Sequence, residues 1–138
     1  MSDTSVTLVV PARPEYLLLT RLALTGVARL GSADEEALAD LRLAVTEAVA
    51  NACRHAYEDG GGDVTVGLSL IGDDRLEVVV EDDGSGFDQH VADERQSDGP
   101  GEDGMGLAII RAVADEVEIG PRKDGRPGTR LRFTRSLR

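Results

Sequence analysis

The sequence predicts an α+β fold, a two-layer α/β sandwich in which a mixed, mostly antiparallel sheet is covered on one face by helices. Segments with the period-two alternation of strands occur near both ends and in the middle of the chain, and apolar segments typical of helices lie between them. With 138 residues, 41% of them hydrophobic and 30% charged, the chain fits one compact domain over residues 1–138. Helices mixed with mostly antiparallel strands then give two packed layers.

The first half of the chain predicts one strand and two helices. Residues 4–10 alternate with period two and are followed by a proline, which indicates a strand. An apolar helix is expected over residues 14–30 and is closed by Gly31. Ser32-Ala33-Asp34-Glu35 has the spacing of a capping box, which starts the next helix. This helix, expected to run to about Tyr57, has the strongest helical pattern in the chain.

The second half predicts a hairpin, a loop, a helix and two further extended segments. Strands over residues 64–70 and 76–80 are joined at Gly72-Asp73-Asp74. The stretch from Phe87 to Asp103 has little hydrophobic pattern and is long for a plain connection, which favours a functional lid. A helix from about Gly104 to Asp115, an extended segment from Glu116 to Ile119 and a last strand from Thr129 to Phe133 complete the chain.

Charge and composition exclude several classes of protein. The net charge of −11 argues against a nucleic-acid partner, because phosphate contacts need clustered Lys and Arg. Acidic residues concentrate between Asp73 and Asp103 and basic ones from Arg122 to Arg138, a distribution that is also typical of solvated surface. No apolar stretch approaches the roughly 20 residues of a membrane span. The start of the chain also lacks the pattern of a signal peptide, so we expect a cytoplasmic protein with no membrane partner.

Cys53 is the single cysteine of the chain, which rules out an intramolecular disulfide and suits a reducing compartment. Together with two histidines it offers too few soft ligands for a structural zinc site. We expect a small buried thiol here rather than a redox switch.

Asp82 is the first candidate for a functional residue. It continues the inward phase of the strand before it, so the strand geometry directs a carboxylate towards the covered face of the sheet, where it needs a partner. The following residues, Asp83-Gly84-Ser85-Gly86, place two glycines where a flat ligand could approach the backbone closely. An aspartate that only caps its own turn is the alternative. An EF-hand is excluded, because Gly84 occupies a position that needs a ligand side chain.

Glu47 and Asn51 form the second candidate, because residues four apart share one face of a helix. One Asn carbonyl together with phosphate oxygens could hold Mg²⁺, and a neighbouring Glu could accept a proton from an attacking hydroxyl. The same pair also occurs on plain helix surfaces.

Gly104-Met105-Gly106-Leu107 is the third candidate. It lies at the predicted start of a helix, where free N–H groups and the helix dipole attract phosphate. A flexible joint between the lid and the helix is the alternative. The chain has no Walker-type P-loop.

Four motifs in this order resemble those of the GHKL (Bergerat-fold) ATPases. Residues 47–51 look like the N box, residues 82–86 like the first glycine box, and residues 104–107 like the second; Gly128-Thr129 matches the late Gly-Thr of that family. The chain is most similar to the anti-sigma serine kinases of the RsbW and SpoIIAB kind, from about Val6 to Phe133.

This resemblance implies a role for each motif residue. Asn51 would ligate Mg²⁺, Glu47 would be the general base, and Asp82 would accept a hydrogen bond from the adenine amino group. The remaining residues implied to bind ATP are His55, Gly84, Gly86, Gly104, Met105, Gly106, Leu107 and Thr129. Arg21, on the first helix, matches a position that the family uses to contact protein partners.

The resemblance also implies a function. Members of the group dimerise, bind a sigma factor and phosphorylate a serine on an anti-anti-sigma protein of the STAS type. We therefore expect an ATP-binding anti-sigma factor with serine-protein kinase activity. The alternative is a catalytically inactive module that binds the nucleotide and controls a partner by binding alone. The predicted lid holds one basic residue, Arg95, so Mg²⁺ and the helix terminus would neutralise most of the phosphate charge.

Overall fold

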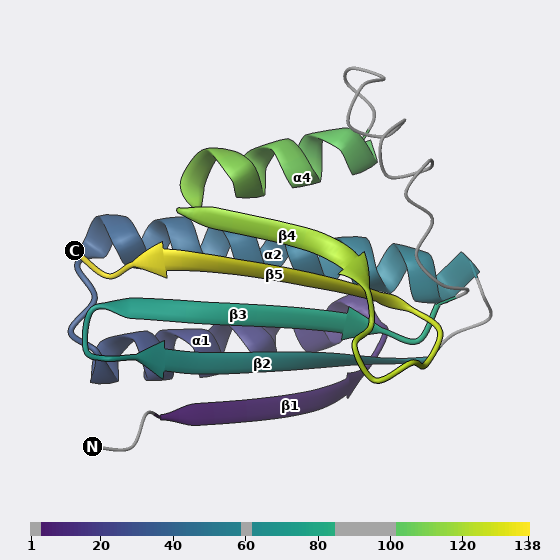
Figure 1. Ribbon diagram of the computed structural model, residues 1–138, viewed down its shortest axis with the longest axis horizontal. Helices are drawn as coiled ribbons and strands as arrows, with labels where there is room; N and C mark the ends of the chain where they lie inside the picture. Colours follow the sequence, from purple (N-terminus) through teal and green to yellow (C-terminus); the bar gives the residue numbers. More distant parts are fainter. Residues whose placement is uncertain (1–3, 59–61, 85–101) are drawn as a thin grey trace.

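The computed structural model describes residues 4–58, 62–84 and 102–138, which form one sheet and a layer of helices (Figure 1). The strands are β1 (Ser5–Pro11), β2 (Asp63–Ile71), β3 (Arg75–Asp82), β4 (Glu116–Pro121) and β5 (Thr129–Ser136). The helices are α1 (Leu17–Leu30), preceded by a short 3-10 turn (Pro14–Tyr16), α2 (Glu35–Glu58) and α4 (Glu102–Val113). The predicted α+β class is confirmed.

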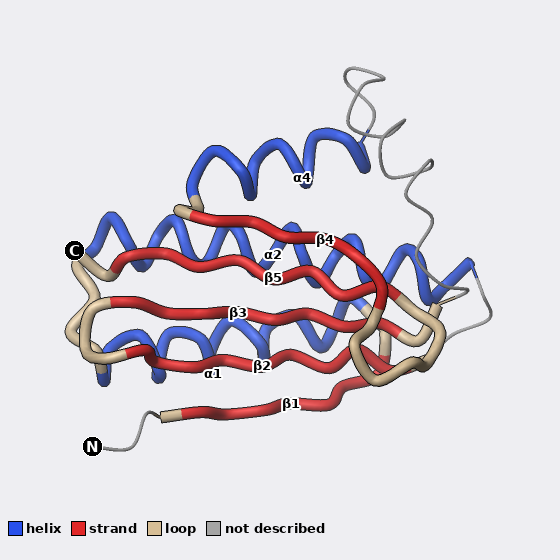
Figure 2. Tube along the Cα trace, viewed as in Figure 1, coloured by secondary structure: helices blue, strands red, loops and turns tan. Residues whose placement is uncertain are grey.

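The sheet has the strand order β1-β2-β3-β5-β4, and each neighbouring pair is antiparallel. The last strand in the sequence, β5, therefore lies inside the sheet. All the helices lie on one side of the sheet, with α1 and α2 behind the strands in the view of Figure 2. As predicted, helices cover one face only.

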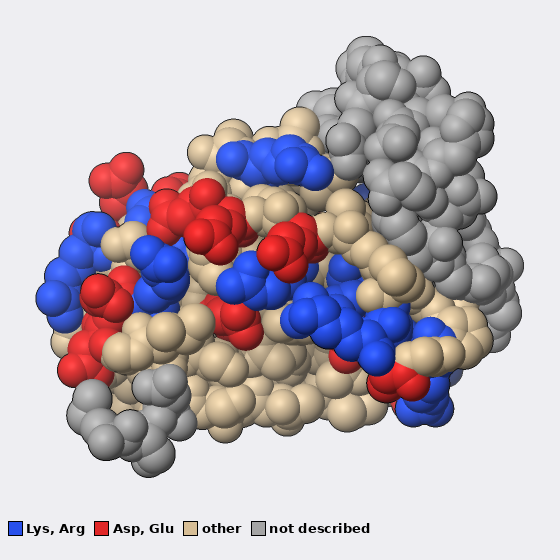
Figure 3. Space-filling view, viewed as in Figure 1, with Lys and Arg blue, Asp and Glu red and all other residues tan. Residues whose placement is uncertain are grey.

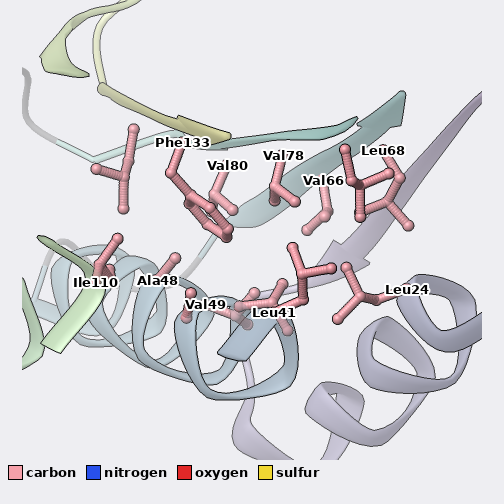
Figure 4. Close-up of a cluster of buried hydrophobic side chains, with 14 of the residues drawn as sticks. Leu24, Leu41, Ala48, Val49, Val66, Leu68, Val78, Val80, Ile110 and Phe133 are labelled. Atoms are coloured by element: carbon pink, nitrogen blue, oxygen red, sulfur yellow. The ribbon is translucent and has the colours of Figure 1, made fainter. Parts of the chain in front are cut away.

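The core lies between the sheet and the helices (Figure 4). Alternate residues of β2, β3 and β5 face the helices and are buried, among them Val66, Val78 and Phe133. Leu24 of α1 and Leu41 of α2 meet them from the other layer. Each large side chain of this kind contributes about 1.5–3 kcal/mol when fully buried. The same alternation brings Asp82, the last residue of β3, onto the covered face.

No described helix covers the other face of the sheet, and its charged side chains are concentrated on one part of it (Figure 3). Lys, Arg, Asp and Glu side chains gather over β4 and β5. There Arg132 hydrogen-bonds Glu77 at 2.7 Å and lies 3.7 Å from the carboxylates of Glu116 and Glu118. The hydrogen bond to Glu77 raises the pKa of Arg132. The middle of β1 and β2 is largely uncharged.

The start of α2 differs from the predicted capping box. The N–H of Ala37 donates to the Asp34 carboxylate at 2.8 Å, so Asp34 caps the helix. Ser32 instead has φ = +58°, a left-handed conformation in the turn between the two helices. An N-cap residue needs a β-region backbone, so Ser32 cannot fill that position, and the capping-box prediction is wrong.

A glycine is needed at Gly31, which ends α1, because the turn packs closely against other side chains. Its φ is −91°, so no left-handed backbone demands glycine there. A Cβ at this position would lie 2.5 Å from Leu137 and 2.8 Å from Leu70, so the turn is pressed directly against the two leucines.

The helix α4 begins at Glu102, two residues before the predicted start at Gly104. Gly104 and Met105 are consequently inside the first turn. Of the predicted lid, residues 87–101 lie outside the described residues. Within the described ranges, no helix is long and apolar enough to cross a membrane.

Candidate functional site

Asp82 holds a buried carboxylate at one end of the sheet. The residue is 3% exposed, and its Oδ1 accepts hydrogen bonds from the main-chain N–H groups of Gly84 at 2.9 Å and Thr129 at 3.2 Å. Gly84 follows β3 and Thr129 begins β5, so the donors come from two separate segments. Because a buried carboxylate is costly without compensating polar groups, these N–H groups stabilise a negative charge at this end of the sheet.

Gly128 allows the turn before β5 to lie directly against Asp82. Its φ is +134°, in the region that favours glycine. A Cβ at this position would overlap the main-chain oxygen of Asp82 and lie 2.9 Å from the Arg122 side chain. The Gly-Thr pair recognised in the sequence thus combines a close approach with an N–H group that reaches Asp82.

Glu47 and Asn51 lie half-buried on α2, where α4 packs over them. A Cβ at Gly106 would be 3.1 Å from Oε2 of Glu47, so the missing side chain leaves room for that carboxylate. Oδ1 of Asn51 is buried and has no hydrogen-bond partner among the described residues. A buried acceptor without a partner costs about 1–3 kcal/mol, which favours a bound donor or cation at this atom.

Arg54 is a charged residue of this region that the sequence analysis did not single out. A Cβ at Gly106 would lie 3.9 Å from its Nη2, which places the guanidinium near Glu47 and the second turn of α4. Its position three residues after Asn51, on the same helix face, is the signal that could have identified it. The guanidinium adds a positive charge to this region.

For the other predicted site residues, the structure describes the side chains of some and not of others. Leu107 is half-buried and packs against the core, next to Gly106 in α4. His55 follows Asn51 by one turn of α2, but its side chain lies outside the described residues, as does the whole of Gly86. Arg21 is exposed on α1, a helix that contributes to neither group of site residues.

Cys53 lies on a different face of α2. It lines a pocket of about 450 Å³ with Ala12, Pro14, Leu17, Val49, Ala50 and Arg54. Val49 and Cys53 are two residues either side of Asn51, so they face roughly the opposite way around the helix. Cys53 is a buried free thiol, as expected, and burial raises its pKa.

The arrangement of α2, α4 and the end of β3 is that of a known family. The model of the histidine kinase-like ATPase domain matches residues 10–135 of the chain. The chain belongs to the histidine kinase-like ATPase family. Membership implies that the protein uses ATP, and the resemblance drawn from the four sequence motifs is confirmed.

Within this ATPase family, the chain is similar to curated serine-protein kinases. The chain is 40% identical to the serine-protein kinase RsbW of Listeria monocytogenes serotype 4a over 125 residues, which cover 83% of the chain and 78% of the relative. It is 42% identical to the RsbW of Bacillus subtilis over 123 residues, covering 80% and 74%.

A solved structure of the ATPase family shares the fold over almost the whole chain. It is the crystal structure of the RsbU and RsbW domains of a Mycobacterium tuberculosis protein, with a TM-score of 0.70 and 25% sequence identity. The similarity covers 98% of this chain and 33% of the other, so the chain spans about a third of that larger protein.

Proposed function

We propose that this chain is an ATP-binding anti-sigma factor with serine-protein kinase activity, formed by one ATPase domain over residues 1–138 and acting in the cytoplasm. It would sequester a sigma factor and phosphorylate a serine on a STAS-type anti-anti-sigma protein. The observation that carries the proposal is the buried carboxylate of Asp82, held between the end of β3 and the start of β5.

Asp82 would recognise the adenine ring. A carboxylate has about four acceptor positions, so the main-chain bonds from Gly84 and Thr129 are compatible with a further bond from the adenine amino group. Gly84 and Gly86 would let the ring approach the backbone, and Thr129 would lie beside it. His55 would sit close to the nucleotide.

Asn51 would hold Mg²⁺ through Oδ1, the buried oxygen without a partner in the described part of the chain. Magnesium commonly takes one or two protein ligands and completes its shell with phosphate oxygens and water. This suits the site, because no three His, Cys, Asp or Glu residues among those described form a metal cluster. The ion, when bound, would neutralise phosphate charge beside the N-terminus of α4, where Gly104, Met105, Gly106 and Leu107 bound the phosphates.

Glu47 would act as the general base. ATP supplies the phosphoryl group, and the carboxylate of Glu47 would accept the proton from the serine hydroxyl of the protein substrate. The contact with Gly106 in α4 would hold the carboxylate in place, with Arg54 close by.

Two variants test the proposal separately for binding and chemistry. Asp82→Asn keeps the shape of the side chain, and its one amide oxygen would accept the bonds from Gly84 and Thr129. The amide NH2 would then face the adenine amino group as a second donor, so calorimetry with ATP and Mg²⁺ should show at least about tenfold weaker binding, from the loss of about one charged hydrogen bond. Equal ATP uptake by the variant and the parent would contradict the adenine assignment.

Glu47→Ala should bind ATP as the parent does but transfer phosphate at least about 100-fold more slowly in a single-turnover assay with a co-purified antagonist, as for the loss of a general base. If the variant transfers phosphate at the parental rate, Glu47 is not the base. If the parent itself binds ATP but transfers none, the chain is the inactive binding module instead.

The chain would also form a homodimer through α1. Four leucines of this helix are exposed: Leu18, Leu19, Leu22 and Leu30. Leu18 and Leu22 are four residues apart and about 60% exposed, so they form an apolar stripe on the outer face. Arg21, beside this stripe, would contact the protein partners.

A further inference from the structure

Arg122, directly after β4, makes more ionic contacts than the sequence suggests. Its Nη1 donates to Asp83 at 2.8 Å and to the main-chain oxygen of Asp82 at 3.3 Å. On the other side of the guanidinium group, Nη2 and Nε donate to the Asp124 carboxylate at 2.8 and 3.3 Å, respectively. The side chain is only 7% exposed, whereas both carboxylate partners are partly exposed. Arg122 therefore joins the β4–β5 turn to the end of β3.

These contacts converge on the backbone of Asp82. Gly128, in the same turn, packs against the main-chain oxygen that accepts the bond from Arg122, and also contacts the Arg122 stem. The next residue, Thr129, donates its N–H to the Asp82 carboxylate. The position of the Thr129 N–H relative to Asp82 thus depends on the contacts that hold the β4–β5 turn against the end of β3.

The chemistry of the contact needs an arginine. Its planar guanidinium presents donors in two directions, so it can bind Asp83 and Asp124 at once, whereas a lysine ammonium is a single point charge. The hydrogen bond to Asp124 and the nearby carboxylates raise the pKa of Arg122, so the residue stays cationic at any ordinary assay pH. Asp124 also accepts the N–H of Arg126, which orders the turn itself.

We propose that Arg122 is a positioning residue for adenine recognition: by fastening the β4–β5 turn to Asp82 and Asp83, it sets the orientation of the Asp82 carboxylate towards the base. This inference rests on the proposed function, in which Asp82 reads the adenine amino group. Arg122 acts through Thr129 and Asp82 and does not touch the nucleotide.

The test measures how strongly the protein prefers ATP over GTP, because a loss of stability alone does not change this preference. A carboxylate that accepts from the 6-amino group of adenine meets the 6-oxo group of guanine with repulsion, so the parent should bind ATP much more tightly than GTP. With Arg122→Ala, calorimetry in Mg²⁺ should give about tenfold weaker ATP binding and a ratio of GTP to ATP dissociation constants that falls by a similar factor. Arg122→Lys should recover only part of this loss.

Arg132→Ala is the matched control, because Arg132 is also largely buried and bonded to carboxylates, but on the uncovered face of the sheet, whereas the Asp82 carboxylate lies on the covered face. It should lower the melting temperature and leave both dissociation constants unchanged. If Arg122→Ala also lowers only the melting temperature and leaves both dissociation constants unchanged, Arg122 contributes to stability alone and the inference is overturned.

Asp124→Asn provides a second route should Arg122→Ala fail to fold. This variant alters Asp124, the exposed partner of Arg122. It should weaken ATP binding and the preference for ATP over GTP, as Arg122→Ala does, but by a smaller factor. Unchanged binding would overturn the inference. If the parent discriminates and Asp82→Asn does not, the proposed function stands whatever Arg122 does. If the parent does not prefer ATP, both ideas fail.

Discussion

At Gly128, backbone conformation and packing each exclude a side chain. We expect Gly128→Ala to destabilise the protein by about 1–3 kcal/mol from its positive φ alone, and by more because the Cβ overlaps Asp82. Urea unfolding measures the difference. Gly26 is the control, because a Cβ there contacts nothing within 4 Å and alanine should stabilise α1 by about 0.5–1 kcal/mol. Equal unfolding midpoints for Gly128→Ala and the parent would mean that the turn does not lie against Asp82.

The thiol of Cys53 should react slowly. Burial raises its pKa, with only partial opposition from the positive charge of Arg54, so the protonated form is favoured in the fold. The stability that this preference gives is present below the ordinary thiol pKa and is lost as the pH rises towards the raised value. We expect iodoacetamide at pH 8 to modify the native protein at least about tenfold more slowly than the urea-unfolded chain, because the thiolate is the nucleophile. Similar rates in both states would show that the thiol is accessible and ionised.

Single residues also show where sequence reasoning succeeds and where it stops. The burial of Asp82 followed from the phase of β3, because each strand residue changes face in turn. The role of Arg122 could not be inferred, because Asp82 and Asp83, its partners at the end of β3, are about 40 residues away in the sequence and are brought to it only by strand pairing. Ser32 was misassigned because a capping-box spacing does not reveal a left-handed backbone.

Among the elements, the contact between α2 and α4 brings the second glycine motif to Glu47. Gly106→Ala would place a methyl group 3.1 Å from the Glu47 carboxylate, which is flexible enough to move by a few tenths of an ångström. We therefore expect little loss of stability, but slower phosphate transfer, because the proposed base is displaced. Single-turnover transfer and thermal unfolding, measured on the same samples, separate the two effects. Gly120→Ala, in β4 and without close contacts, should leave transfer unchanged. Full activity of Gly106→Ala would argue against a fixed position for Glu47.

The elements themselves were largely predictable, since their apolar periods are clear. The longest helix, the β2–β3 hairpin and the final strand were all expected, and their ends differ by a few residues. Helix ends depend on side-chain contacts such as the cap formed by Asp34, which the apolar period does not record.

For the whole molecule, the exposed leucines of α1 lead to a prediction about association. Replacing Leu18 and Leu22 together with Glu should convert the proposed dimer into a monomer, because two buried apolar contacts become two like charges facing each other. Sedimentation equilibrium reports the mass directly. Leu30→Glu is the control, since Leu30 is equally exposed but lies off the stripe at the end of the helix. An unchanged dimer mass in the double variant would place the interface elsewhere.

The strand order also constrains how the chain can fold during synthesis. Because β5 is made after β4 yet lies between β3 and β4, a growing chain that lacks it leaves the β3 edge unpaired and Phe133 absent from the core. Leu137, which follows β5 and is fully buried, makes backbone hydrogen bonds to Asp34 and Asp74 and so fixes both turns at that end of the molecule. Such long-range pairing slows folding. A ribosome-bound nascent chain would therefore remain open to chaperones until β5 and Leu137 emerge.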